Sequence, residues 1–320
     1  MMLGGGGLLR KLGVMLIVLL LGACAQPSLP TIDPSVDFVA SLNTVEGTID
    51  FISSEQEVFE TWQLDEAYTG FTLVSDDLIL LYGFTLKEAD LYQLSTGKQL
   101  ATFDVREGAT FAYAYNENIY IANGKENTVS LFNKEGHLIK RATAGNYPMS
   151  MIVAHDDLYV VNFKDEILSI FSLDLTEKNE WEIPNSSHGL LINRNELWLG
   201  GHGAGSRPNR VIERYSLETG KLLGEVEAPM MPINMTKASN GHIFAVSHGN
   251  STVYEISETG EVLSSFKAGA NPFSIATFGE CIVLAGYDDH QIYFFQTGKK
   301  MNKIHVGEGP FQLVVREVSK

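Results

Sequence analysis

The imidazole groups of this sequence are the side chains best suited to chemistry near neutral pH, because histidine changes its charge there. The chain holds eight histidines. His188, His202 and His248 fall in similar local contexts, and Asp288 and His290 follow in the next such context. Neutral imidazoles and carboxylates could bind a divalent ion or act as general acids. No His-x-His or His-x-x-x-His spacing occurs, so we expect no metal site.

Other catalytic patterns are either absent from the sequence or lack the neighbouring elements that their chemistry requires. The glycines of Gly201-x-Gly203-x-Gly205 follow an expected strand but open no helix, so they do not form a dinucleotide-binding fingerprint. No Gly-x-Ser-x-Gly elbow occurs, and no Ser/His/Asp set has a useful local context. We therefore assign no catalytic residue, expect no cofactor, and favour a protein that is not an enzyme.

Short β-strands in a repeat are the elements expected to position the histidines. Apolar segments separated by 41, 39, 39, 46 and 39 residues begin at Leu78, Ile119, Leu158, Leu197, Ile243 and Ile282. Each is followed by a second strand, a polar turn that often contains glycine, and a third strand. A fourth strand then begins at a segment such as Asn271-Pro272. Four short strands about every 40 residues are typical of a β-propeller blade.

The two ends of the chain indicate how such a ring would close. The last segment, 309–315, has the pattern of an inner strand with no blade after it. The first segments, 38–45, 48–52 and 58–64, are three strands without an inner partner. Pairing them predicts an all-β fold, a seven-bladed β-propeller of four-stranded antiparallel blades, closed by a C-terminal strand that completes the first blade. One domain would then span residues 36–320, with no open sheet edges.

Several of the repeated segments resemble those of YVTN-type β-propellers, a family of bacterial surface and periplasmic repeat proteins. The resemblance covers about residues 36–320 and rests on the Thr-Gly-Lys turns, Tyr120-Ile121-Ala122-Asn123, Tyr159-Val160-Val161-Asn162, Asn271-Pro272 and Gly309-Pro310. Blade 2 departs from the pattern, because Tyr68-Thr69-Gly70 replaces the Pro-containing strand start. The resemblance implies the fold. It says little about the function, because members of the family are mostly binding proteins or proteins without an assigned function.

The N-terminus has the pattern of an export signal. Arg10 and Lys11 precede the apolar run 12–21, which is too short to span a bilayer comfortably. Leu21-Gly22-Ala23-Cys24 then resembles the lipobox of bacterial lipoproteins. That resemblance implies cleavage before Cys24 and lipidation of its thiol. We expect a signal peptide over 1–23, a Pro-rich extended tether over 24–35, and a lipid anchor in the cell envelope, on the extracytoplasmic side of a bacterial membrane.

Net charge limits the partners. Lys and Arg number 23 against 39 Asp and Glu, which gives −16, and losing Arg10 and Lys11 makes the mature chain −18. Such a chain repels phosphate, so we expect no nucleic-acid partner. We also expect no electrostatic binding to an anionic membrane surface.

Cys281 is the one cysteine besides Cys24, so no internal disulfide is expected, and its apolar surroundings predict a buried, inert thiol. We expect a monomer.

One face of the propeller is expected to collect the histidines. The loop that enters an inner strand and the loop between a blade's second and third strands lie on the same face, which we call the mouth face. Blade 5 also carries about seven extra residues within 200–210, a candidate contact loop. The predicted binding face consists of His188, His202, Arg207, Arg210, His248, Phe273, Asp288, His290 and Phe311.

Three interpretations of this face remain open. The histidines could be polar turn residues, with His188 a hydrogen-bonded rim residue. They could belong to a surface that recognises a protein, peptide or glycan, which makes the chain a membrane-anchored binding or scaffold module. Alternatively, they could belong to a metal- or haem-linked enzyme or redox accessory protein with a site near His188. If their pKa values are ordinary, their protonation between about pH 5 and 7 would alter binding.

Overall fold

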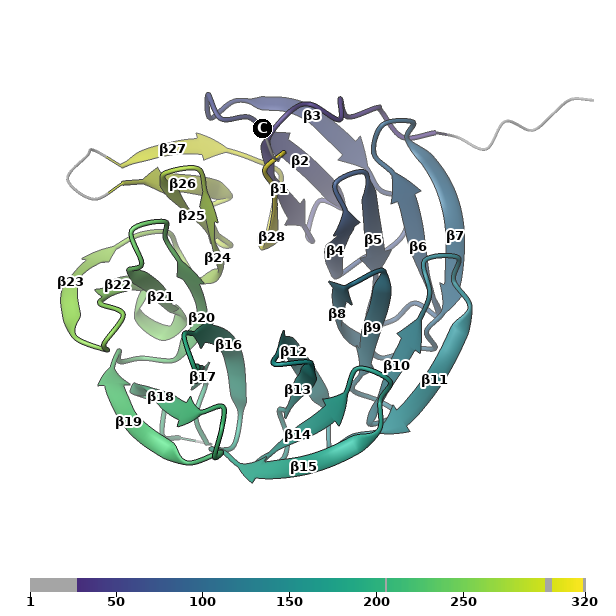
Figure 1. Ribbon diagram of the computed structural model, residues 1–320. Coiled ribbons are helices and arrows are strands. Elements are labelled where there is room, and N and C mark those ends of the chain that lie inside the picture. Colours follow the sequence, from purple (N-terminus) through teal and green to yellow (C-terminus); the bar gives the residue numbers. More distant parts are fainter. Residues whose placement is uncertain (1–27, 205, 297–300, 319–320) are drawn as a thin grey trace, which may run out of the picture.

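The computed structural model describes residues 28–204, 206–296 and 301–318. These residues form 28 β-strands in seven four-stranded antiparallel sheets, arranged as a ring (Figure 1). The predicted seven-bladed propeller is therefore confirmed. The predicted signal peptide and Cys24 lie outside the described residues. Within the described parts of the chain, no helix has the length and apolar character needed to cross a membrane.

The blades follow the chain in order, and the strands of each blade run from the inner to the outer one. Blade 1 is β28 (Pro310–Arg316), β1 (Phe38–Asn43), β2 (Thr48–Ile52) and β3 (Val58–Gln63). Blade 2 is β4 (Gly70–Ser75), β5 (Leu78–Tyr82), β6 (Glu88–Gln93) and β7 (Lys98–Asp104). Blade 3 is β8 (Ala109–Tyr115), β9 (Asn118–Asn123), β10 (Thr128–Phe132) and β11 (Leu138–Thr143).

The other four blades repeat this order. Blade 4 is β12 (Pro148–Ala154), β13 (Asp157–Asn162), β14 (Ile167–Ser172) and β15 (Glu177–Glu182). Blade 5 is β16 (Ser187–Asn193), β17 (Glu196–Gly201), β18 (Val211–Ser216) and β19 (Leu222–Glu227). Blade 6 is β20 (Pro232–Lys237), β21 (Ile243–Ser247), β22 (Thr252–Ile256) and β23 (Val262–Lys267). Blade 7 is β24 (Pro272–Phe278), β25 (Cys281–Gly286), β26 (Gln291–Phe295) and β27 (Asn302–His305).

The hydrophobic core lies between adjacent blades. Phe51 and Trp62 of blade 1, for example, pack in one cluster with Phe71 and Ile79 of blade 2, and all four side chains have no exposed surface. Strands near the middle of each blade are covered on both faces, which explains their continuous apolar runs. Because each blade buries its faces only against its neighbours, the stability of one blade depends on the others.

Closure of the ring follows the prediction. Strand β28 pairs antiparallel with β1, with Val315 opposite Val39, so the C-terminal strand completes blade 1. Figure 1 shows the C-terminus beside the first strands of the chain. The pairing gives β1 a partner on each side, so the inner edge of β1 is no longer open.

A buried arginine joins this last strand to both neighbouring segments. Arg316 is 1% exposed, and its guanidinium donates hydrogen bonds to the backbone carbonyls of Asp33 (2.6 Å), Val36 (2.6 Å) and Asp76 (2.9 Å). The same group lies 4.4 Å from the centroid of the Phe38 ring. Burial lowers the pKa of Arg316, and the negative charge of nearby aspartates opposes that shift. Sequence patterns gave no sign of this residue's role.

The predicted tether is shorter than expected. The backbone N–H of Leu29 donates to the carbonyl of Gly97 (2.9 Å) and that of Ile32 to the carbonyl of Leu94 (2.8 Å). The indole N–H of Trp62 donates to a carbonyl in the same segment (2.8 Å), and Ile32 is fully buried. The chain is therefore fixed to the propeller from Leu29, not from residue 36. The composition alone did not distinguish this docked segment from a free tether.

The thiol of Cys281 also differs from its prediction. It is partly exposed rather than buried, because Cys281 is the first residue of β25, next to an open turn. Its sulfur accepts a hydrogen bond from Nε2 of Gln296 at 3.5 Å.

Replacing Arg316 with methionine should lower the free energy of unfolding by roughly 3 kcal/mol, because it leaves several carbonyls without their charged donor. The matched control is Arg210→Ala, which removes an exposed arginine that pairs with Glu227 at 3.3 Å. We expect the control to cost less than about 1 kcal/mol. Urea denaturation of both variants measures the difference. Equal losses would contradict the closing role of Arg316.

Replacing Gly97 with alanine should release the N-terminal segment, because a Cβ atom there would lie 1.7 Å from the carbonyl oxygen of Leu29. Gly279→Ala is the control: Gly279 also has a positive φ, of 59°, but nothing lies within 4 Å of its Cβ position. Both variants incur about 1–2 kcal/mol of backbone strain. Only Gly97→Ala should expose residues 28–36 to limited proteolysis, detected by mass spectrometry. Equal cleavage in both variants would show that the segment does not depend on this contact.

Candidate functional site

Six inner strands present one residue each at the mouth face by the same local irregularity. The strand pairing skips one residue directly after the strand start, or two residues (188 and 189) in blade 5, so that a β-bulge or similar irregularity forms there. The residues at the bulges are Thr110, Met149, His188, Ile233, Phe273 and Phe311. A residue with positive φ precedes each strand start, for example Asn271 at 53° or Gly309 at 71°. Bulges change the direction in which a side chain points.

Polar groups at or beside these bulges connect neighbouring inner strands. The hydroxyl of Thr110 donates to the carbonyl of Pro148 at 2.6 Å, from blade 3 to blade 4. Nδ1 of His188 lies 3.1 Å from the carbonyl of Ile233, from blade 5 to blade 6. Because a carbonyl only accepts, this nitrogen carries the proton, and Nε2 of the neutral ring remains an acceptor. His188 is therefore a hydrogen-bonded rim residue, whatever else it contacts.

Aromatic rings and imidazoles from the mouth loops form one continuous series of contacts. Successive ring centroids lie 4.5–6.3 Å apart. The series runs through Phe84, Tyr147, Phe163, His202, His248, Phe273, Tyr287 and Phe311. His188 joins it through His202 at 6.0 Å. Every member is partly exposed. We call this set of nine residues the mouth collar; it extends over blades 2 to 7 and the start of β28.

Three imidazoles stand together in the collar, as the sequence predicted. The ring centroids of His202 and His248 lie 5.8 Å apart, and that of His188 lies 6.0 Å from His202. The Nδ1 atoms of His202 and His248 are buried and have no hydrogen-bond partner. Among the described residues, however, no group of three or more His, Cys, Asp or Glu is arranged to hold a metal ion.

Burial favours the neutral form of these imidazoles. It lowers the pKa of His188 and of His248, and it lowers the pKa of His202 to about 4, with the other two rings adding to the effect on His202. The expected charge change between pH 5 and 7 therefore moves to lower pH at these residues. The sequence-based expectation assumed exposed imidazoles, and their packing against one another and against aromatic rings overrides it.

The other predicted residues occupy separate places. Oδ1 of Asp288 accepts from the side chain of Asn271 at 3.2 Å, in an exposed turn. His290 lies at the junction of blades 7 and 1, where its Nδ1 accepts from the backbone N–H of Gly309 at 3.2 Å. Arg207 is exposed, and Arg210 pairs with Glu227. Of these other predicted residues, only Phe273 and Phe311 belong to the collar.

The extra residues of blade 5 form a loop held at its base beside the imidazoles. The N–H of Asn209 donates to the carbonyl of His202, and the N–H of Met231 donates to the carbonyl of Asn209, both at 2.8 Å. Gly203 has a φ of 87°, and a Cβ there would lie 2.4 Å from the nitrogen of Asn209. A glycine is therefore required where this loop turns back. The loop's position on the mouth face agrees with the prediction.

Sequence reasoning missed four members of the collar: Phe84, Tyr147, Phe163 and Tyr287. A signal for two of them was present, because Phe163 and Tyr287 directly follow the second strand of their blades, as His202 and His248 do. Aligning the blades at that position would have identified them. Tyr147 instead precedes a strand start, where its φ of 64° turns the chain into β12.

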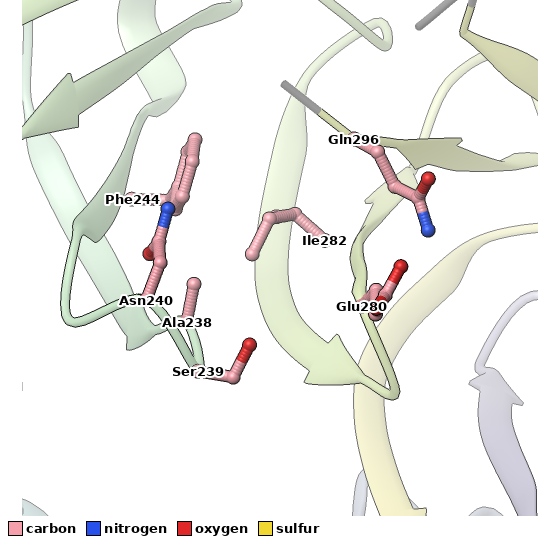
Figure 2. A pocket seen from close by; sticks show the side chains of 7 residues that line it. All are labelled: Ala238, Ser239, Asn240, Phe244, Glu280, Ile282 and Gln296. Atoms are coloured by element: carbon pink, nitrogen blue, oxygen red, sulfur yellow. The ribbon is translucent and has the colours of Figure 1, made fainter. Parts of the chain in front are cut away.

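A pocket away from the mouth face lies between blades 6 and 7. Figure 2 shows residues of the β20–β21 turn and Phe244 facing Glu280, Ile282 and Gln296. A similar hollow lies between blades 7 and 1, lined by Cys281 and Gln56 among others. Both are grooves between neighbouring blades, and the first has Glu280 as its one charged residue. Their chemistry is less distinctive than that of the collar.

Comparison with known proteins identifies the fold alone. No protein-family model and no curated protein matches the sequence. Among solved structures, virginiamycin B lyase from Staphylococcus aureus has a TM-score of 0.63 at 18% identity, over 75% of this chain and 84% of the other. A protein of unknown function from Desulfotomaculum acetoxidans has 0.74 at 10%, over 87% and 98%. The dihydro-heme d1 dehydrogenase NirN has 0.63 at 12%, over 87% and 76%. All three identities are too low to transfer an activity.

Acid should destabilise the protein through His202. Its pKa is ordinarily 6.5 and falls to about 4 in the folded chain, so the unfolded state binds more protons between these values. The stability that the neutral ring contributes is therefore complete above pH 6.5 and is lost as the pH falls towards 4. We expect His202→Phe, which keeps a ring without the charge, to lose less in melting temperature than the wild type between pH 7.5 and 4.5.

The control for this measurement is Phe163→Leu, which alters a ring in contact with His202 without removing a titrating group. It should lower the melting temperature by similar amounts at both pH values. A parallel decline of the wild type and His202→Phe with acid would refute the assignment.

Proposed function

We propose that this protein is a binding or scaffold module and that the mouth collar is its recognition surface. The observation that carries this proposal is the continuous series of partly exposed rings on one face, with ring centroids 4.5–6.3 Å apart. Aromatic side chains contribute large contact areas and are enriched at binding sites. No complete catalytic set accompanies them among the described residues.

The partner is a protein, peptide or glycan that offers an apolar or flat face to these rings. Neutral imidazoles favour such a face over a strongly anionic group, since burial holds their pKa values down. At the other side of the collar, Lys164 lies 4.1 Å from the centroid of the Tyr147 ring and Lys125 lies 5.0 Å from that of Phe84. These ammonium groups could pair with polar groups at the rim of a ligand.

The place of action is the outside of a bacterial cytoplasmic membrane. The sequence at Leu21-Gly22-Ala23-Cys24 supports lipidation of Cys24, and the YVTN-like repeats support an envelope protein. Two acyl chains anchor a chain without any basic patch, each buried methylene contributing about 0.8 kcal/mol. That suits a chain with a net charge of −16 before processing.

A second candidate function, a metal- or haem-linked enzyme or redox accessory protein near His188, has one observation in its favour. The buried Nδ1 atoms of His202 and His248 have no hydrogen-bond partner in the protein, and a ligand could supply one. Virginiamycin B lyase and NirN are enzymes with the same fold. Elemental analysis of the purified protein separates the two functions: one metal per chain, lost in His202→Ala, would favour the second.

The binding proposal is tested by panning a random peptide library and probing a glycan array with the purified full-length chain. We expect the selected peptides or glycans to bind the Phe273→Ala/Phe311→Ala variant at least tenfold more weakly, because both rings belong to the collar. The matched control, Leu222→Ala/Leu223→Ala, removes two exposed apolar side chains that are remote from the collar. Binding that persists in the collar variant and disappears in the control would place the recognition surface elsewhere.

A further inference from the structure

The point at which the N-terminal segment joins the propeller is fixed. Leu29 is held on the turn between β6 and β7 by its hydrogen bond to Gly97 (2.9 Å). Five residue steps separate Leu29 from Cys24, and a fully extended chain covers at most about 3.6 Å per residue. A lipid on Cys24 would therefore keep this turn within about 18 Å of the bilayer.

This turn lies on the side of the ring opposite the mouth. Phe84 of the collar precedes β6, so β6 begins near the mouth face, and the strand ends at the turn that holds Leu29. In Figure 1 the N-terminal segment reaches the outer edge of the ring beside β7. The attachment point is therefore both remote from the mouth and peripheral.

Exposed apolar side chains flank this attachment point. They occupy the beginnings of the outermost strands β3, β7 and β11 in blades 1, 2 and 3. They are Val58 (39% exposed), Phe59 (41%), Leu100 (53%), Leu138 (47%) and Ile139 (57%), and we call them the lower edge. Blade 4 has Glu177 and Lys178 at this position, so the apolar run ends there. Similar pairs in blades 5 and 6 lie across the ring from the attachment point.

We propose that the lower edge rests on the lipid bilayer to which the N-terminus is attached, so that the mouth face points away from the membrane. This inference rests on the membrane anchor of the proposed function. Apolar side chains enter the boundary between headgroups and acyl chains. Because the chain is strongly acidic, apolar contact and the lipid, rather than charge attraction, hold this edge to the surface.

The orientation is tested with single fluorescent labels on the full-length chain, prepared with its native processing and reconstituted in phosphatidylcholine vesicles. Cys281→Ser removes the other cysteine. Labels are then placed at Leu100→Cys on the lower edge, at Leu223→Cys in the same position of blade 5, and at Arg207→Cys in the mouth loop. Lipids carrying nitroxide groups on their acyl chains quench a label by contact.

We expect quenching at residue 100 to exceed that at residues 223 and 207 at least threefold. Quenching at residue 207 equal to or above that at residue 100 would overturn the orientation, even where mass spectrometry finds the lipid on Cys24. A chain recovered entirely in the soluble fraction would overturn both the anchor and the orientation. Peptide or glycan binding that persists in the collar variant, by contrast, would contradict the recognition surface alone, so the two proposals fail separately.

Discussion

The blades of this propeller bury their faces only against each other, and the fold therefore depends on a closed ring. The contact between β28 and β1, which we call the closing joint, is the critical one, because it pairs an early strand of the sequence with a late one. The charged guanidinium of Arg316 lies in that joint and donates hydrogen bonds to backbone carbonyls of the N-terminal segment and of blade 2. An apolar residue would satisfy none of those carbonyls. The joint is thus specified by geometry as well as by hydrophobic area.

The same ring sets the character of the mouth. A bulge at the start of each of six inner strands directs one side chain to the mouth, and the loops after the second strands bring further rings alongside. Packing these groups together removes water from the imidazoles and lowers their pKa values. The result is a group of imidazoles that gain their charge at lower pH than isolated histidines do. The same backbone bulge recurs in these blades with residues of different chemistry, from Thr110 to Phe311, so a regular fold acquires a surface of its own.

Much of the fold could be predicted because repeats multiply a weak signal. One strand such as Leu78–Tyr82 is ambiguous, but six similar segments at nearly constant spacing are not. The same alignment placed His202 and His248 together. It failed where contacts cross between unlike segments: nothing in the sequence couples Arg316 to the carbonyl of Asp33, 283 residues away. It also failed for the pKa of the histidines, which depends on burial and not on position along the chain.

The pairing of β28 with β1 has a consequence for how the molecule is made. A chain is synthesised from its N-terminus, so the strands of blade 1 emerge first and the strand that completes them emerges last. Until then the inner edge of β1 is open and able to pair with another chain. The nascent protein must pass through this vulnerable interval, and contacts that span some 280 residues form slowly. A chaperone that shields the edge of β1 would protect the step at which the ring is most exposed to aggregation.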